Sequence, residues 1–207
     1  MGRRRTLLAA GLVLALVARV AGAIDAGPLS ITAVPPADPQ PASHPWAVYL
    51  DGYIDPGAAG RLAGLMQRSG IRHAVVFLNS PGGSLLAAMD LGRLLRAGGF
   101  DTNVGRRAPD GREPEAGVCY SSCPFAYAGG VRRSLLRGSA LGVHQPRNLT
   151  PVVDPQAFER RVSADATDYL EGMGVNPVLA SIMAQAPHDA IRLVGRGEAE
   201  RLALVND

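Results

Sequence analysis

A short serine-containing segment holds residue types that can perform nucleophilic chemistry. Residues 119–124 read Cys-Tyr-Ser-Ser-Cys-Pro and precede an apolar stretch. Proline is tolerated in the first turn of a helix, so a helix is predicted to begin near Cys123, with Ser121 or Ser122 at its start. A hydroxyl at that place lies beside free backbone N–H groups, which can stabilise an oxyanion. The alternative for either serine is an ordinary helix N-cap.

Two further segments carry groups that such chemistry needs. Residues 142–146 read Gly-Val-His-Gln-Pro, and we expect His144 to end a buried strand, at the sheet edge where α/β proteins bind ligands. Residues 79–84 read Asn-Ser-Pro-Gly-Gly-Ser, and glycines there let the backbone approach a ligand and present N–H donors. The alternatives are a structural histidine and a tight turn followed by an N-cap.

The elements that must position these groups alternate along the chain. Apolar runs and helical periodicity predict strands at residues 47–54, 71–78, 100–104 and 140–144, and helices at 58–68, 84–97, 122–129, 155–171, 177–185 and 198–204. Alternation of this kind indicates an α/β domain with largely parallel pairing. We assign this single domain to residues 46–207. Arg132, Arg133 and Arg137 are interpreted as a solvated surface.

The segments that precede the domain are interpreted as an export signal and a linker. Residues 1–23 begin with an arginine triplet at 3–5, followed by an uncharged run over residues 7–18 and by Ala-Gly-Ala at 21–23, the pattern of a cleaved signal peptide. The apolar run is shorter than the roughly 20 residues of a membrane span, and an uncleaved anchor is the alternative. Residues 24–45 are rich in proline and alanine and are predicted to form a linker or extended arm. Export, with a periplasmic location, would place the domain in an oxidising compartment and leave no stable membrane span.

Composition excludes several function classes. The chain has 207 residues and a net charge of +3, but residues 1–23 contain four arginines and no acid. The remainder is weakly acidic, so the charge gives no support for nucleic-acid binding. The sequence contains no lysine. This excludes a Schiff-base lysine, a Ser–Lys dyad and a phosphate-binding loop that requires lysine.

The three segments together resemble a known family. The order Leu-Asn-Ser-Pro-Gly-Gly-Ser at 78–84, Cys-Tyr-Ser-Ser-Cys-Pro-Phe-Ala-Tyr-Ala-Gly-Gly at 119–130 and Gly-Val-His-Gln-Pro at 142–146 resembles the Clp protease proteolytic subunit. It is most similar to exported Clp-protease-like proteins of bacteria. The resemblance implies a crotonase-type fold of repeated ββα units in a single α/β domain. It also implies a serine peptidase that acts on peptides or proteins without a cofactor or metal, and it allows a homo-oligomer, because relatives assemble into rings.

Site residues follow from the resemblance by position. The family's nucleophile stands nine residues before the glycine that closes the apolar helix, which is Ser121 counted back from Gly130. The resemblance makes His144 the general base and Asp189 the carboxylate that orients the imidazole. The resemblance also implies an oxyanion hole formed by the backbone N–H groups of Gly82, Gly83 and Ser122.

Other interpretations remain open from the sequence alone. Cys119 and Cys123 flank Ser121 and would lie about 6 Å apart across a helical turn, so they form either a disulfide or two buried thiols, with a metal-binding or catalytic thiol as a third option. The main alternative to a hydrolase is an exported binding or scaffold protein that retains the fold without catalysis. A crotonase-like acyl-thioester enzyme is a third hypothesis, and export away from coenzyme A argues against it.

Overall fold

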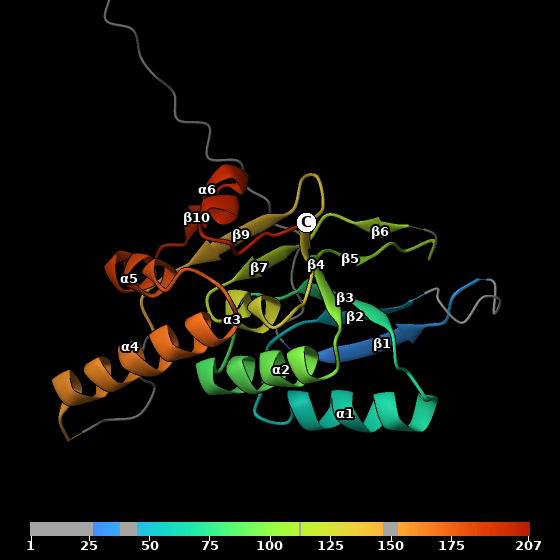
Figure 1. The fold of residues 1–207 in the computed structure, drawn as a ribbon, viewed down its shortest axis with the longest axis horizontal. Coiled ribbons are helices and arrows are strands. Elements are labelled where there is room, and N and C mark those ends of the chain that lie inside the picture. The colour runs from blue at the N-terminus through green and yellow to red at the C-terminus, as the bar shows by residue number, and fades with distance from the viewer. Residues whose placement is uncertain (1–26, 38–44, 112, 147–152) are drawn as a thin grey trace, which may run out of the picture.

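The computed structural model of the protein describes residues 27–37, 45–111, 113–146 and 153–207 (Figure 1). The signal peptide predicted at residues 1–23 and much of the predicted linker lie outside these residues. Within the described ranges, no helix is both long enough and apolar enough to cross a membrane. The mixed α/β architecture predicted from the sequence is confirmed.

A five-stranded sheet runs through the body of the molecule in the order β1-β2-β3-β4-β8. Its strands are β1 (Ser30–Val34), β2 (Trp46–Asp51), β3 (Ala74–Asn79), β4 (Asp101–Val104) and β8 (Arg133–Leu135). Strands β2, β3, β4 and β8 run parallel to one another. Helices α1 (Ala58–Ser69) and α2 (Leu85–Ala97) connect β2 to β3 and β3 to β4, and lie side by side below the sheet in Figure 1.

A glycine ends the first connecting helix, and a serine N-cap begins the second. Helix α1 buries Ala58, Leu62 and Met66 at four-residue intervals and ends at Gly70, which adopts a left-handed φ of 65°. Helix α2 begins after Ser84, whose hydroxyl accepts a hydrogen bond from the Ala87 N–H at 3.3 Å. This N-cap fixes the end of the glycine turn that the sequence analysis singled out.

The predicted linker contains a strand. Residues 24–45 were expected to form a linker or arm, but Ser30–Val34 pairs antiparallel with β2, from Ser30 opposite Asp51 to Val34 opposite Ala47. This stretch is free of proline and rich in β-branched residues, with Pro28 before it and a proline pair after it. Because β1 is at the edge of the sheet, only one side of its backbone needs partners, so the flanking prolines do not prevent pairing. The domain therefore extends N-terminal to residue 46.

A second sheet of three strands carries the segments of chemical interest. Its order is β10 (Arg192–Val194), β9 (Ala140–Val143) and β7 (Val118–Tyr120), with β7 and β9 parallel. Helix α3 (Cys123–Ala128) follows β7 and packs against α2. A small hairpin of β5 (Arg106–Arg107) and β6 (Pro114–Glu115) lies in the stretch that precedes β7.

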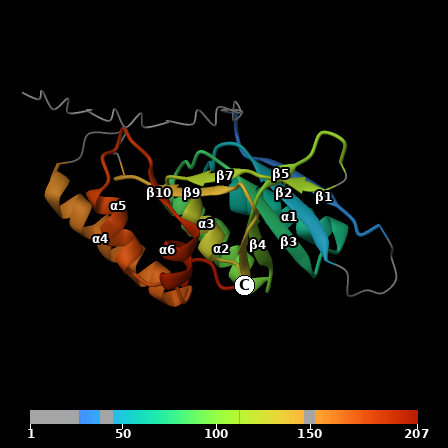
Figure 2. The same ribbon diagram turned by 90° about the horizontal axis from the view of Figure 1, so that it is seen from above.

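The C-terminal helices cover one end of the molecule (Figure 2). They are α4 (Pro155–Gly172), α5 (Val178–Gln185) and α6 (Arg196–Arg201). Arg133, expected on a solvated surface, is 3% exposed. Its guanidinium donates hydrogen bonds to the carbonyl oxygens of Gly130, Ala203 and Leu204 at 2.8, 2.7 and 3.1 Å. These bonds attach the C-terminal tail to β8 and stabilise an otherwise costly buried charge.

Candidate active site

Ser121 occupies a strained turn between β7 and α3. Its φ is 61°, a left-handed value that a residue other than glycine rarely adopts. Its backbone N–H donates to the Gly142 carbonyl of β9 at 3.0 Å. Such strain costs of order 1–3 kcal/mol and is retained where the surroundings enforce it, often at functional sites. In α/β-hydrolases, a sharp strand-to-helix turn exposes the hydroxyl of a serine in this way.

A disulfide bridges the two ends of this turn. Cys119 and Cys123 are joined, with their Cα atoms 5.1 Å apart, and both residues are fully buried. The sequence had left a disulfide and two buried thiols as alternatives. Because the bridge encloses Ser121, it restricts the backbone on both sides of the candidate nucleophile.

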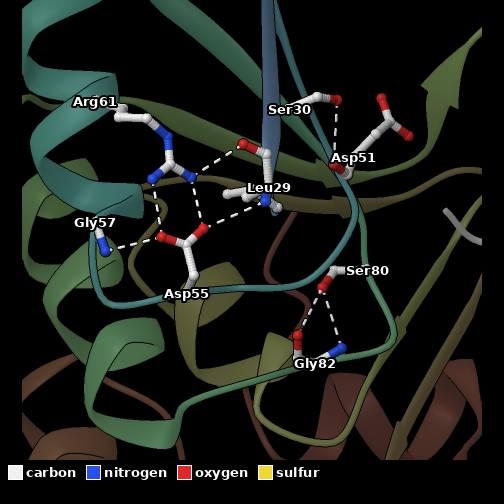
Figure 3. Close-up of polar contacts among 8 residues, drawn as sticks. All are labelled: Leu29, Ser30, Asp51, Asp55, Gly57, Arg61, Ser80 and Gly82. Carbon is white, nitrogen blue, oxygen red and sulfur yellow. Dashed lines mark hydrogen bonds and ion pairs between the residues drawn. The ribbon is translucent and has the colours of Figure 1, made fainter. Parts of the chain in front are cut away.

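The backbone of Ser80 holds the glycine turn after β3 against β7, and its side chain closes the turn. The Ser80 N–H donates to the Val118 carbonyl at 2.8 Å, and the Tyr120 N–H donates to the Ser80 carbonyl at 3.0 Å. Within the turn, the Gly82 N–H donates to the Ser80 hydroxyl at 3.0 Å (Figure 3). The Gly82 N–H is therefore already used, and the predicted role of Gly82 as an oxyanion donor is not supported by this geometry.

Glycine is required at both positions of the turn because other backbone lies too close for a side chain. A Cβ atom on Gly82 would lie 2.5 Å from the Cβ atom of Ser121, and one on Gly83 would lie 2.3 Å from the Ile54 carbonyl oxygen. Gly82 also has a φ of 108°. The absence of a side chain thus lets the turn pack directly on the candidate nucleophile.

Two backbone N–H groups near Ser121 remain available. In the part of the chain that the structure describes, no hydrogen bond uses the N–H of Gly83 or of Ser122. Both residues line the same cavity as Ser121. The Ser122 N–H belongs to the N-cap residue of α3, and the first N–H groups of a helix have no partner within it. Gly83 and Ser122 are two of the three residues that the resemblance names as oxyanion donors, and their N–H groups remain free to bind a ligand in the cavity.

His144 reaches the same cavity from the neighbouring strand. Tyr120 at the end of β7 is paired with Gly142 of β9, so Ser121 and His144 both follow the carboxyl ends of adjacent parallel strands. The structure contains no hydrogen bond between the two side chains, and catalytic contacts often tighten only when substrate binds. The His144 Nδ1 atom is buried and has no partner among the described residues.

Asp189 is not brought to this cluster. It lies in an exposed turn after α5 and does not line the cavity. Of the three residues predicted to form a triad, Ser121 and His144 line the same cavity and Asp189 lies outside it. An acidic residue that does line the cavity is Asp165 of α4. Asp165 shares one helix face with Phe158, Arg161 and Val162, which also line the cavity. Their i, i+3, i+4, i+7 spacing can be seen in the sequence and places them on one face of a helix, and the sequence analysis did not use it.

The cavity itself has mainly apolar walls and a volume of about 790 Å³. Helix α2 contributes Leu85 and Met89, while α4 and α5 contribute Val162 and Met183. The polar lining includes Ser121, Ser122 and His144, together with Ser84 and the charged residues Arg161 and Asp165 of α4. The arrangement presents a hydroxyl, an imidazole and two free N–H donors at the side of a hollow that suits an apolar group.

An ion pair behind the site supports the segment that holds the glycine turn. The Ile54 N–H donates to the Gly82 carbonyl, and the Ser84 N–H donates to the Ile54 carbonyl. The next residue, Asp55, accepts two hydrogen bonds from Arg61 and one each from the N–H groups of Gly57 and Leu29 (Figure 3). The Arg61 guanidinium, more than any other contact, holds the pKa of Asp55 well below its usual range.

Other ionisable groups near the site are shifted by burial. Burial raises the pKa of the Tyr120 phenol, so this side chain stays neutral at physiological pH. Across residues 27–37, 45–111, 113–146 and 153–207, no three histidine, cysteine or acidic side chains are grouped so as to hold a metal ion.

Comparison with known proteins bears on the fold. No protein-family model matches the chain, and no curated protein does. Among solved structures, a chain described as 1510-N membrane-bound stomatin-specific protease, in a mutant form, has a TM-score of 0.52 and 13% sequence identity, over 77% of this chain and 75% of that one. The fold is that of the Clp-like proteases. The fold class predicted from the sequence is thereby confirmed, and at this identity the similarity extends to the fold alone.

Proposed function

We propose that the protein is a serine hydrolase that cleaves peptides, with Ser121 as nucleophile and His144 as general base. The observation that carries this proposal is the backbone of Ser121. A serine with φ of 61° stands between a disulfide and a glycine turn, next to two unused N–H donors and a histidine that line the same cavity. A routine N-cap serine needs none of these features.

The proposed reaction uses the groups in two steps. The Ser121 hydroxyl oxygen attacks the substrate carbonyl carbon while His144 accepts the hydroxyl proton. The tetrahedral oxyanion is stabilised by the N–H groups of Gly83 and Ser122, each worth roughly 3 kcal/mol by analogy with measured oxyanion donors. His144 then gives the proton to the leaving amine. Water hydrolyses the acyl-enzyme by the same route, and the serine hydroxyl is restored.

The experiment that tests this function is covalent labelling of folded, oxidised protein by a fluorophosphonate probe. Wild type should be labelled, and Ser121→Ala and His144→Ala should not. Ser122→Ala keeps the backbone N–H and should still be labelled. Ser181→Ala removes an exposed hydroxyl on α5 and serves as the matched control, with unchanged labelling. Labelling that persists in Ser121→Ala would show that another serine is the nucleophile.

A second candidate function is an exported binding or scaffold protein that keeps the fold without catalysis. One observation favours it: the buried His144 Nδ1 has no partner among the described residues, whereas serine hydrolases orient this nitrogen with a carboxylate. Unlabelled wild type that nevertheless binds peptides would support this candidate.

We further propose that the protein is exported, and that its partners are peptides or proteins. The sequence pattern of residues 1–23 supports export, and the disulfide is consistent with an oxidising compartment. Detection of the mature chain in a periplasmic extract, with an N-terminus near residue 24, tests the location. Size-exclusion chromatography with light scattering tests whether the chain assembles into oligomers.

A further inference from the structure

Two buried side-chain polar atoms lack a hydrogen-bond partner among the described residues, and both belong to residues that line the active-site cavity. They are the Ser122 hydroxyl and the Nδ1 atom of His144. Buried polar atoms are almost always hydrogen-bonded, and one that stays unpaired costs free energy. Because both atoms belong to the wall of one cavity, they indicate that a ligand with polar groups completes the bonding there.

The Ser122 hydroxyl has no structural task in the free protein. Ser122 precedes α3, but its side chain makes no capping hydrogen bond to that helix. The residue is only 5% exposed, so the hydroxyl is not an ordinary hydrated surface group. The proposed reaction uses the backbone N–H of Ser122 and not its side chain. Neither the fold nor the proposed reaction therefore accounts for this hydroxyl.

The buried part of the cavity wall is uncharged. Ser122 shares it with Met89 of α2 and Met183 of α5, and we call these three buried residues the cavity floor. The charged residues of the wall, Arg161 and Asp165, are both exposed and carry opposite signs. A side chain that reaches the cavity floor therefore meets two thioethers and one hydroxyl.

The composition of the cavity floor restricts the chemistry of its occupant. Methionine side chains are flexible and pack well against aliphatic and aromatic groups, so they can shift to admit a ligand to the floor. A serine hydroxyl can both donate and accept a hydrogen bond. A charged group would lose its hydration there without meeting an opposite charge. The cavity floor thus suits a side chain with an apolar body and a neutral polar end.

We infer that the Ser122 hydroxyl determines specificity in this cavity: it binds the neutral polar end of a substrate side chain whose apolar body lies on Met89 and Met183. Tyrosine and glutamine are natural side chains with this chemistry. The inference rests on the proposed function, because it takes the occupant to be a side chain of a peptide held at Ser121. It adds a preference that a cavity with purely apolar walls would not have.

Peptide binding by Ser121→Ala protein tests this preference without catalysis. Fluorescently labelled alanine peptides carry one larger side chain each, in two matched pairs: tyrosine with phenylalanine, and glutamine with norleucine. Adding Ser122→Ala should raise the ratio of the two Kd values, polar member over apolar member, about tenfold in at least one pair, because the polar end loses its partner. The pair that responds identifies the side chain. A glutamate peptide should bind more weakly than the glutamine peptide, since the cavity floor offers no opposite charge.

Ser181→Ala is the matched control, since it removes an exposed hydroxyl on α5, and it should leave both ratios unchanged. Thermal unfolding separates specificity from a structural role: Ser122→Ala should not lower the melting temperature, because its hydroxyl has no partner to lose among the described residues. A lower melting temperature, ratios that rise less than about twofold in both pairs, tighter binding of the glutamate peptide, or no binding by any peptide would overturn the inference.

Probe labelling of wild type is read independently of these ratios. If wild type is labelled but neither ratio responds to Ser122→Ala, the specificity is refuted and the hydrolase is retained. If a ratio responds but wild type is not labelled, the hydrolase is refuted and the cavity remains a binding site for that side chain.

Discussion

The ion pair of Asp55 and Arg61 gives a sharp test of how the glycine turn is supported. The Asp55 carboxylate accepts hydrogen bonds from Arg61 at 2.8 and 2.6 Å, from the Gly57 N–H at 2.9 Å and from the Leu29 N–H at 3.3 Å. Asp55→Asn keeps the size of the side chain but removes the charge and one acceptor oxygen. We expect the folded protein to lose stability at neutral pH.

The magnitude follows from these contacts and their exposure. Four bonds to a charged group, at about 1.5 kcal/mol each, would give roughly 6 kcal/mol. The side chains of Arg61 and Asp55 are 43% and 23% exposed, so solvent screens the pair and surface ion pairs of this kind contribute far less. We therefore predict a loss of about 2 kcal/mol in the free energy of unfolding at pH 7.

The loss should depend on pH in a defined direction. The folded pKa of Asp55 lies below its usual range because of Arg61. A depressed carboxyl pKa contributes stability that is fully present above the unfolded value of about 3.9, and this is lost as pH falls through the folded value. The difference between wild type and Asp55→Asn should be constant from about pH 7 to 5 and should shrink below about pH 4.

Urea unfolding at several pH values measures this difference. Glu200→Gln is the control, because Glu200 and Arg196 are both about half exposed and 3.8 Å apart, and its effect should stay within about 0.5 kcal/mol. The Asp55 variant should also be labelled more slowly by the fluorophosphonate probe, since Ile54 holds the glycine turn. A loss below about 0.5 kcal/mol, or a difference that grows on acidification, would refute the reasoning.

Three further perturbations test the surroundings of the nucleophile and the C-terminal tail. Replacing both Cys119 and Cys123 by alanine opens a short loop and should cost about 2 kcal/mol, with slower probe labelling; unchanged thermal unfolding would contradict a stabilising bridge. Gly82→Ala places a Cβ atom 2.5 Å from that of Ser121 and should abolish labelling, whereas Gly60→Ala, with nothing within 4 Å, should leave it unchanged. Arg133→Met removes the donor to the Ala203 and Leu204 carbonyls, whereas the Gly130 carbonyl keeps a bond from Arg96. It should lower the free energy of unfolding by about 2–3 kcal/mol, measured by urea denaturation; a loss under about 1 kcal/mol would mean that the two carbonyls find other donors.

Elements of the fold could be predicted where the apolar residues of a segment recur with a clear helical or strand period. The helices at 58–68 and 84–97 were placed to within one residue at each end, because their apolar faces and the serine before Leu85 are local signals. Strand β1 was missed because the surrounding prolines outweighed a five-residue strand, and an edge position is decided by tertiary pairing. Short strands such as β8 and β10, with three residues each, carry too few residues for a period to emerge.

Local motifs predicted which residues gather at the cavity, and the prediction failed for residues whose position depends on tertiary packing. The cavity brings together Ser121, Ser122, Gly83 and His144, as the motifs suggested. Asp189 was chosen from its position in the chain, but the turn after α5 leaves it exposed. Burial of Arg133 could not be predicted, since its carbonyl partners come from residues about 70 positions further along the chain.

The strain at Ser121 explains why several unusual features occur together. A left-handed serine is unfavourable by itself, so the neighbouring structure must hold it in place. The disulfide restricts the chain before and after it, its N–H is bonded to Gly142 of the strand that leads to His144, and Gly82 fills the space beside its side chain. Each of these contacts could occur in a structural turn, but together they fix the hydroxyl relative to both the imidazole strand and the free Gly83 N–H. The N-cap position of α3 is held by Ser122 and not by Ser121, so helix capping does not account for the left-handed backbone of Ser121.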